Sequence, residues 1–435
     1  MRAAFYTLGC KVNQYETQIL EQMFYGGGYD IVPTDSPADV FVINSCTVTS
    51  SGDKKTRQAL RHFKRANPGS VAVLTGCFPQ AFPQEAAKIT EADVITGSYN
   101  RSGLLHDIES FLQTGSRVIN ITPHERGEKF ESMTASRFLD RTRAFVKIQD
   151  GCERFCTYCI IPMARGPRRS KPLDELYDEL TGLASAGYKE AVLVGINLPS
   201  YGTEGGSVRL IDAIELACGV SGIERVRLGS LEPEVLTDDD IARMAAQPKF
   251  CPQFHLSLQS GCDATLKRMN RHYSSAQYSE MVQKLRSAFN NCSITTDIMV
   301  GFPNETDEEF ESSLAFAKNI GFAKVHVFPY SIRKGTRAAS MTGQQSRAVK
   351  EKRAAVMLAA MAESRKSFLH TQLGKTEEVL FETITTALGT EGYTKNYTPV
   401  RVLSQKNISG CLYPVRLLAV SGEYCIGELV EPNLI

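Results

Sequence analysis

Three cysteines in one short segment have the residue type and the spacing of a metal-cluster loop. Cys152, Cys156 and Cys159 are separated by three and two residues, directly after Gly151. A cubane iron–sulfur cluster is normally held by four cysteine thiolates. Three thiolates on one loop therefore predict a cluster with one iron open to a small molecule, and S-adenosylmethionine can fill that position.

A second set of three cysteines is spread over the first part of the chain. Each follows a predicted strand, in the runs Leu8-Gly9-Cys10, Asn44-Ser45-Cys46 and Thr75-Gly76-Cys77. In an open parallel sheet the carboxyl ends of the strands line one edge, where ligands bind. We therefore expect these cysteines to converge there and to hold a second cluster, again with three thiolates.

Other uses of cysteine explain the pattern less well. Structural zinc sites favour a C-x2-C pair followed by a second pair or by histidines, and no such second pair lies near Cys152. Disulfide scaffolds are short, cysteine-dense secreted chains, whereas this chain has 12 cysteines in 435 residues. The other six are expected to be packing or loop residues: Cys218, Cys251, Cys262, Cys292, Cys411 and Cys425.

The charge of the whole chain is balanced, with 49 Lys and Arg against 48 Asp and Glu, which excludes a globally basic nucleic-acid binder. Local charge differs: residues 54–65 hold six basic and no acidic residues, and residues 137–171 have a net charge of +6. These segments are suited to phosphate contacts. We find no apolar signal core and no run of about 18 apolar residues. The expectation is a cytoplasmic protein with reduced thiols and no membrane partner.

The elements that position these residues follow from patterning. Residues 1–118 alternate short apolar runs with helical stretches, which predicts a parallel α/β domain, and the polar residues 119–136 predict a linker. Residues 137–369 predict a complete or partial (β/α) barrel of about six units. Its strand candidates are Ala144–Ile148, Ala191–Val194, Arg225–Leu228, Phe254–Leu258, Ser293–Val300 and Lys324–Phe328.

Two further elements complete the chain. Gln344–Leu373 is free of Pro and Gly and predicts one long helix at the end of the core. Residues 370–435 have short strand patterns separated by glycines, which predicts a small β-barrel.

Two segments resemble those of a known family, the radical S-adenosylmethionine methylthiotransferases, and the similarity covers essentially the whole chain. They are Gly151–Gly166 and the run Tyr6-Thr7-Leu8-Gly9-Cys10-Lys11-Val12-Asn13-Gln14-Tyr15-Glu16-Thr17. The resemblance implies an auxiliary 4Fe-4S cluster on Cys10, Cys46 and Cys77, and a radical 4Fe-4S cluster on Cys152, Cys156 and Cys159. It also implies that the C-terminal barrel is a TRAM domain that contacts the RNA or protein substrate.

Within the family, the run from Leu8 to Glu16 resembles the branch that methylthiolates N6-threonylcarbamoyladenosine beside the anticodon of tRNA. The reaction replaces a hydrogen on an adenine ring carbon, which requires a radical that the cofactor supplies. The implied cofactors are two 4Fe-4S clusters and S-adenosylmethionine. The implied partners are the tRNA anticodon arm, an electron donor of flavodoxin or ferredoxin type, and a sulfur source.

Several alternatives stay open. The isopentenyladenosine and ribosomal-protein branches of the same family differ in only a few residues of the opening motif. A radical methyltransferase would move methyl without sulfur and would not need the second cluster. A noncatalytic RNA-binding iron–sulfur protein would use its clusters to stabilise the fold, although a structural cluster gains nothing from a missing fourth ligand.

Further candidates come from position along the chain. Barrel active sites lie at the carboxyl ends of the strands, which indicates these S-adenosylmethionine contacts: Tyr158, Gly195, Asn197, Ser230, Glu232 and Gln259. Basic and aromatic side chains contact phosphates and stack on unpaired bases, which indicates these RNA contacts: Arg165, Arg168, Arg169, Tyr393, Lys395, Tyr397 and Arg401. Because residues 370–435 hold seven Glu against five Lys and Arg, RNA contacts of the barrel should be local.

Overall fold

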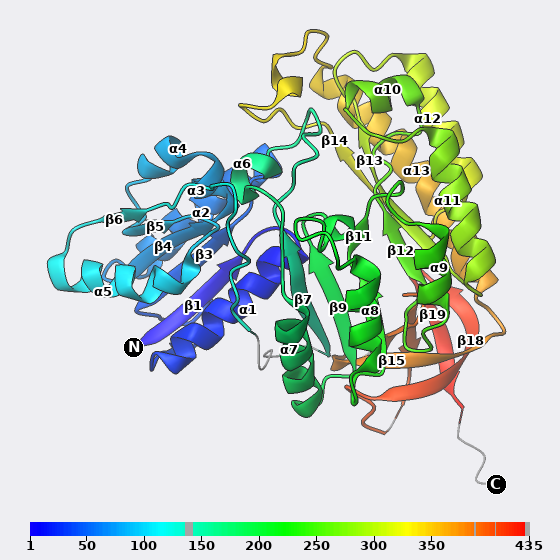
Figure 1. Ribbon diagram of the computed structural model, residues 1–435, viewed down its shortest axis with the longest axis horizontal. Helices are drawn as coiled ribbons and strands as arrows, with labels where there is room; N and C mark the ends of the chain where they lie inside the picture. Colours follow the sequence, from blue (N-terminus) through cyan, green and yellow to red (C-terminus); the bar gives the residue numbers. More distant parts are fainter. Residues whose placement is uncertain (135–141, 387–388, 405, 431–435) are drawn as a thin grey trace.

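The computed structural model describes residues 1–134, 142–386, 389–404 and 406–430. Figure 1 shows an N-terminal sheet unit beside a curved central unit, with a small barrel below the central unit. The predicted fold class is therefore confirmed. Among the described helices, none is both long enough and apolar enough to cross a membrane.

The N-terminal sheet has six strands, all parallel, in the order β2-β1-β3-β4-β5-β6. They are β1 (Arg2–Thr7), β2 (Asp30–Ile31), β3 (Val40–Ser45), β4 (Val71–Gly76), β5 (Val94–Thr96) and β6 (Val118–Asn120). The central strands are apolar on both faces because helices cover both. One face carries α1 (Lys11–Gly26) and α5 (Leu104–Thr114), and the other α2 (Ser50–Ala66), α3 (Cys77–Ala81) and α4 (Pro83–Ala87).

The central unit is built on two four-stranded sheets, ordered β10-β9-β7-β8 and β11-β12-β13-β14. All neighbours are parallel except β8, which is antiparallel to β7. The predicted strands correspond to β7 (Arg143–Asp150), β9 (Glu190–Gly195), β10 (Arg225–Leu228), β12 (Gln253–Leu256), β13 (Ser293–Val300) and β14 (Lys324–Pro329). Two short strands, β8 (Arg169–Ser170) and β11 (Ser230–Leu231), were not predicted. Within the described strands the two sheets do not close into a ring, so the barrel is partial.

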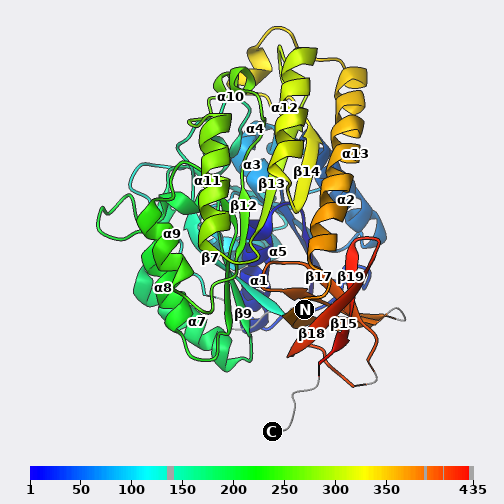
Figure 2. The ribbon, with the colours of Figure 1, turned by 90° about the vertical axis from the view of Figure 1, so that its right-hand side faces the viewer.

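Helices cover the outer side of the central unit (Figure 2). They are α7 (Leu173–Ser185), α8 (Leu210–Gly219), α9 (Asp238–Ala245), α10 (Asp263–Arg268), α11 (Ser275–Ala288), α12 (Asp307–Ile320) and α13 (Arg347–Thr371). The predicted long helix is α13, but it starts three residues later than Gln344. Ser346 sets this start, because its side chain accepts a hydrogen bond from Val349 N and caps the first turn.

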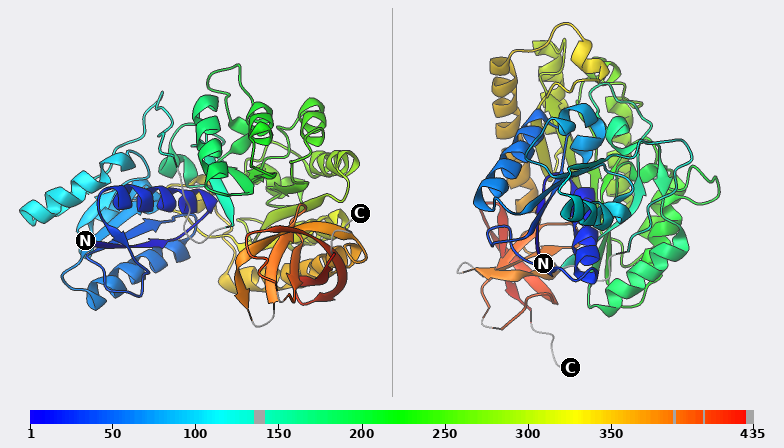
Figure 3. Two further views of the ribbon diagram at one scale, coloured as in Figure 1. Left: turned by 90° about the horizontal axis from the view of Figure 1, so that it is seen from below. Right: turned by 90° about the vertical axis from the view of Figure 1, so that its left-hand side faces the viewer.

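The C-terminal barrel is closed, in the order β15-β16-β17-β19-β18. Its strands are β15 (Thr376–Thr386), β16 (Gly389–Thr394), β17 (Pro399–Val402), β18 (Leu412–Ser421) and β19 (Tyr424–Leu429). Figure 3 shows the barrel against the central unit. Two buried arginines of β10 hold it there: Arg225 donates to Tyr393 O at 2.9 Å, and Arg227 donates to Lys395 O at 2.9 Å.

The N-terminal unit meets the central unit through α1. Tyr15 of α1 is buried in the main core of the central unit, and its hydroxyl donates to Glu179 Oε1 of α7 at 2.9 Å. The aromatic body therefore packs in a core while its polar end is satisfied. This contact fixes the start of α1, and with it Cys10, relative to the central sheets.

Candidate cluster sites and the cavity beside them

The structure brings the N-terminal cysteines to one edge of the first sheet. Cys10 directly precedes α1, Cys46 follows β3, and Cys77 begins α3 directly after β4. Because β1, β3 and β4 are neighbours, their carboxyl ends lie together. The thiols of Cys10 and Cys77 donate to one shared atom, Asn13 Oδ1, at 3.9 and 3.8 Å.

Asn13 organises this edge, and sequence reasoning missed it. Its amide nitrogen donates to the carbonyl oxygens of Leu8 (2.8 Å) and Ser45 (3.0 Å), so its Oδ1 faces the thiols. Gly9, with φ of +116°, leaves room for the cysteines, because a Cβ there would lie 2.9 Å from Cys46 Cβ. Only glycine satisfies both the backbone conformation and the close approach.

Arg165 reaches this edge from the central unit, at the end of α6 (Ile161–Arg165). Its Nε donates to Cys77 Sγ at 3.2 Å, and its Nη2 donates to Asn13 Oδ1 at 2.6 Å. Burial raises the pKa of the Cys77 thiol to about 12, and the charge of Arg165 acts in the opposite direction. A positive donor against the sulfur favours the thiolate, which is the form that binds metal.

A buried ion network surrounds Arg165. Burial by itself would raise the pKa of Glu16, but Arg101, Arg165 and Lys147 together lower it to about 2. The Arg101 and Lys147 nitrogens lie 2.9 and 3.0 Å from Glu16 Oε1. Since Glu16 and Arg101 belong to the N-terminal unit and Lys147 and Arg165 to the central unit, the network joins the two units.

This structure corrects the predicted RNA contacts at Arg165 and Arg169. Both side chains are buried, and Arg169 donates to Arg165 O at 2.8 Å and to Asp150 Oδ2 at 3.2 Å. Guanidinium groups engaged in this way do not face RNA. The basic run resembles an exposed loop in sequence because its acidic partners lie elsewhere in the chain. Arg168 remains accessible, with its side chain 44% exposed.

Replacing Arg165 with methionine tests the network. We expect the free energy of unfolding to fall by about 3–5 kcal/mol, because Glu16 then stays buried with less compensating charge. Guanidinium denaturation measures the loss. Arg168→Met is the matched control: its exposed pair with Glu153, at 3.4 Å, should contribute less than about 1 kcal/mol. Equal losses in the two variants would contradict the structural role of Arg165.

The second cysteine set lies on the loop between β7 and α6. Cys152 N donates to Gly166 O at 3.1 Å, which ties the start of the loop, and Cys159 N donates to Cys156 O at 2.9 Å, which closes a turn within it. Burial raises the pKa of the Cys152 thiol to about 11, and neighbouring Cys156 adds to the rise. Burial and then Cys156 also raise the pKa of Cys159. Both shifts therefore involve Cys156, the middle cysteine of the set.

Arg271 supports this loop as Arg165 supports the other set. Its Nη1 donates to Cys156 Sγ at 3.3 Å, and its buried guanidinium also forms an ion pair with the partly buried Glu232. Its Nε donates to the hydroxyl of Tyr273 at 3.1 Å. Sequence reasoning missed Arg271 because it lies in the turn between α10 and α11, away from any strand end.

The donor chemistry of both sets fits iron–sulfur clusters. Within the described residues, no three cysteine, histidine or carboxylate side chains converge on a point that would hold a single metal ion. A cubane binds each iron through a separate thiolate, so its ligands need not converge in that way. Each set also has an arginine donating to one sulfur, a contact that stabilises a thiolate and tunes a cluster.

Gly151 controls the entry into the second loop. Its φ is +74°, and a Cβ there would overlap the carbonyl oxygen of Pro167. We expect Gly151→Ala to lower the free energy of unfolding by about 2–4 kcal/mol, from the left-handed backbone and the overlap together, and to lower iron retention after reconstitution. Denaturation and iron assays measure both.

The matched control for this prediction is Gly127→Ala. Gly127 also has a positive φ, +81°, but nothing lies within 4 Å of its Cβ position. It should lose only about 1–2 kcal/mol and keep its iron. If both variants keep equal iron, the close approach at Gly151 does not shape the cysteine loop.

Two of the predicted S-adenosylmethionine contacts are linked to the second cysteine set through Arg271. Tyr158 and Glu232 both contact Arg271, Tyr158 through its hydroxyl at 3.4 Å. Asn197 is 9% exposed, and its Oδ1 is buried without a hydrogen-bond partner in the described structure. A buried acceptor of this kind is open to a polar ligand or to a bound water. Gln259 is also 9% exposed and has a φ of +67°.

A cavity of about 950 Å³ lies between the N-terminal unit, the inner side of the central sheets and the C-terminal barrel. Residues of all three units line it, among them Cys10, Lys11, Gly195, Ser230, Tyr393 and Tyr397. Burial and the guanidinium groups of Arg227 and Arg143 lower the pKa of Lys11 to about 8. Lys11 lines the cavity and is exposed to solvent.

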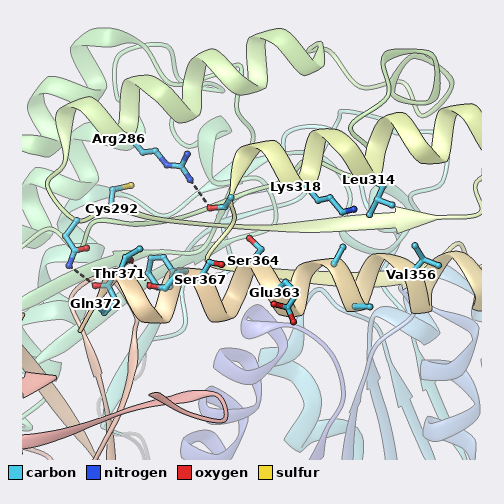
Figure 4. A pocket seen from close by; sticks show the side chains of 15 residues that line it. Arg286, Cys292, Leu314, Lys318, Val356, Glu363, Ser364, Ser367, Thr371 and Gln372 are labelled. Carbon is cyan, nitrogen blue, oxygen red and sulfur yellow. Dashed lines mark hydrogen bonds between the residues drawn. The ribbon is translucent and has the colours of Figure 1, made fainter. Parts of the chain in front are cut away.

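A second cavity, of about 840 Å³, lies on the outer side of the central unit (Figure 4). It is formed by α11, α12 and α13, and Arg286, Lys318 and Glu363 are among its polar residues. None of the predicted site residues lines it. The chemistry therefore belongs to the inner cavity.

The predicted RNA-contacting residues of the barrel lie at or near the inner cavity. Tyr393 and Tyr397 stack on each other with ring centroids 4.5 Å apart, and Arg143 lies over both rings and donates to Tyr397 at 2.7 Å. Lys395 donates to a backbone oxygen, Pro248 O, at 3.2 Å. Arg401 pairs with Glu391 at 2.7 Å. Stacking and Arg143 therefore hold the two tyrosines in place. Lys395 and Arg401 already have partners within the chain.

The fold and the cysteine loop are those of a radical S-adenosylmethionine protein. Residues 146–317 match the Radical SAM superfamily, and residues 2–97 match the Uncharacterized protein family UPF0004. A radical S-adenosylmethionine methyltransferase of known structure, TsrM from Kitasatospora setae, superposes with a TM-score of 0.56 at 12% identity. The match covers 78% of this chain and 77% of that one. Membership of the superfamily implies S-adenosylmethionine and a 4Fe-4S cluster as cofactors.

The chain belongs to the radical S-adenosylmethionine methylthiotransferase family. It is 37% identical to threonylcarbamoyladenosine tRNA methylthiotransferase MtaB of Bacillus subtilis, over 98% of this chain and 96% of the relative. MtaB of Thermotoga maritima is 35% identical over 98% and 97% of the two chains. A tRNA-2-methylthio-N(6)-dimethylallyladenosine synthase of Clostridium botulinum is 34% identical over 97% and 95%.

Proposed function

We propose that this protein transfers a methylthio group to C2 of the adenine in N6-threonylcarbamoyladenosine, next to the anticodon of tRNA. The observation that carries the proposal is the inner cavity, which combines Cys10 of the first cysteine set with residues of the central sheets and of the barrel. Support for the substrate comes from the relatives named for it, which match nearly the whole chain at 35–37% identity.

The two cysteine sets have separate tasks in this proposal. When bound, a cluster on Cys152, Cys156 and Cys159 supplies the electron that cleaves S-adenosylmethionine, and a cluster on Cys10, Cys46 and Cys77 carries the sulfur to be transferred. The network around Arg165 fixes the position of the two cysteine sets relative to each other. The orphaned Oδ1 of Asn197 gives S-adenosylmethionine a buried acceptor.

The regions of the chain divide the work accordingly. Residues 1–118 hold the auxiliary cluster, residues 119–136 link the domains, residues 137–369 carry the radical reaction, and residues 370–435 form a TRAM domain that contacts the anticodon arm. On the cavity wall, Tyr393 and Tyr397 offer aromatic surfaces to an unpaired base. A donor of flavodoxin or ferredoxin type supplies electrons, and a separate sulfur source restores the auxiliary site. The reaction takes place in the cytoplasm.

Mass spectrometry of tRNA nucleosides tests the function. The protein is reconstituted anaerobically with iron and sulfide and incubated with S-adenosylmethionine, dithionite and tRNA that carries threonylcarbamoyladenosine. We expect a methylthio mass gain on that nucleoside and none on isopentenyladenosine in a parallel tRNA. Gain on isopentenyladenosine alone would assign the other substrate. If 5′-deoxyadenosine forms without modification of either nucleoside, the tRNA assignment is wrong.

A further inference from the structure

Lys11 is a second cation next to the first cysteine set, besides Arg165. It follows Cys10 directly, lines the inner cavity and is accessible there. The described structure gives its ammonium no hydrogen bond or ion pair, whereas Arg143 and Arg227 nearby are bonded to Glu382 and Glu190 at 2.6 and 2.8 Å. The Glu190 carboxylate also acts on Lys11, but it is bonded to Arg227. An ammonium with no bonded anion, beside two other cations, calls for an anion from outside the chain.

The N-terminus of α1 also favours an anion beside Lys11. Lys11 is the first residue of α1, which has 16 residues, and Cys10 at the N-cap position makes no side-chain capping bond. The N-terminal end of a helix carries partial positive charge and free N–H groups. Asp297 also lines the cavity, but its Oδ2 lies 3.4 Å from His255 Nε2.

Resting on the proposed function, we infer that Lys11 binds the carboxylate of the threonyl group and thereby selects threonylcarbamoyladenosine over isopentenyladenosine. To receive sulfur from the auxiliary site, C2 of the adenine must approach Cys10. The N6 substituent is attached to C6, and one ring nitrogen separates C6 from C2. The substituent must therefore lie beside the residues next to Cys10. The threonyl group brings one negative charge, whereas the isopentenyl group is a hydrocarbon.

The methionine part of S-adenosylmethionine is another source of a carboxylate in this enzyme, so the experiment has to distinguish the two. Steady-state kinetics are measured for the wild type, Lys11→Met and Lys11→Arg with two tRNAs. One carries threonylcarbamoyladenosine, and the other carries the methyl ester of its threonyl carboxylate. Iron content and the electron paramagnetic resonance spectrum check that each variant holds its clusters, because Lys11 adjoins Cys10.

We expect Lys11→Met to raise the KM for the tRNA with the free threonyl carboxylate by about 10- to 100-fold, because a charged hydrogen bond is lost. The kcat should change less. Lys11→Arg, which keeps the charge, should recover most of the affinity. On the ester tRNA, wild type and Lys11→Met should have the same KM, because the partner of the ammonium is gone.

Three results would overturn the assignment. If the wild type is active and Lys11→Met leaves the KM for the threonylcarbamoyladenosine tRNA unchanged, the role assigned to Lys11 is wrong. The proposed function is then unaffected. A raised KM for S-adenosylmethionine, with the tRNA KM unchanged, assigns the contact to the cofactor carboxylate. If the wild type modifies only isopentenyladenosine, the proposed function and the role of Lys11 fail together.

Discussion

The Cys156→Ala protein is expected to form no 5′-deoxyadenosine from S-adenosylmethionine, and therefore no methylthiolated nucleoside. The change removes one of three thiolates on the loop between β7 and α6, and two are too few to hold a cubane with one open iron. It also leaves Arg271 without the sulfur to which it donates at 3.3 Å. Chromatography of the reaction mixture measures 5′-deoxyadenosine directly.

Cys262→Ala is the matched control for Cys156→Ala. Cys262 has a similar half-buried environment, precedes α10 and makes no capping bond with its side chain. This variant should form 5′-deoxyadenosine at the wild-type rate. Folding of both variants is compared by circular dichroism. Undiminished 5′-deoxyadenosine in folded Cys156→Ala would remove the second set from the radical reaction.

The second large effect is expected from Cys46→Ala. This protein should still form 5′-deoxyadenosine, because the loop with Cys152 is intact, but methylthiolation of tRNA should fall below detection. The auxiliary set would keep only Cys10 and Cys77, while Asn13 and Arg165 still hold their positions. The comparison of 5′-deoxyadenosine with modified nucleoside separates the two sites.

Cys411→Ala, at an exposed position directly before β18, serves as the control for Cys46→Ala and should lose neither activity. Iron per protein should fall by about half in Cys46→Ala if each set holds one 4Fe-4S cluster. Equal loss of both products in folded Cys46→Ala would contradict the division of labour between the sets. Damage to the first set would then also have stopped the formation of 5′-deoxyadenosine, which is assigned to the second set.

The sequence predicted the fold class because its signals are local. Runs such as Val40–Ser45 and Val71–Gly76 are apolar throughout, as buried parallel strands must be, and cysteines placed directly after such strands reach the same sheet edge. A partial barrel and a complete one were equally compatible with the same units, since closure depends on how the outer strands pair.

The contacts that hold the cysteines were less predictable. Arg165 and Glu16 are separated by 149 residues, yet their side chains form a buried ion pair. No local pattern distinguishes a basic residue in such a pair from one on a solvated loop, and for this reason the predicted RNA contact was wrong at Arg165. Asn13 could have been found, because it lies one helical turn after Cys10 and faces the same side.

The shared ion network also limits how this chain can be recombined. A chimera that joins residues 1–118 to the core of a distant relative would bring Glu16 and Arg101 but would leave Lys147 and Arg165 behind. Unless the new core offers cations at the same places, Glu16 would be desolvated and poorly compensated at the junction. The N-terminal unit therefore cannot be exchanged by itself without loss of stability. To alter the substrate range of an engineered hybrid, only the segment around Lys11 should be transferred.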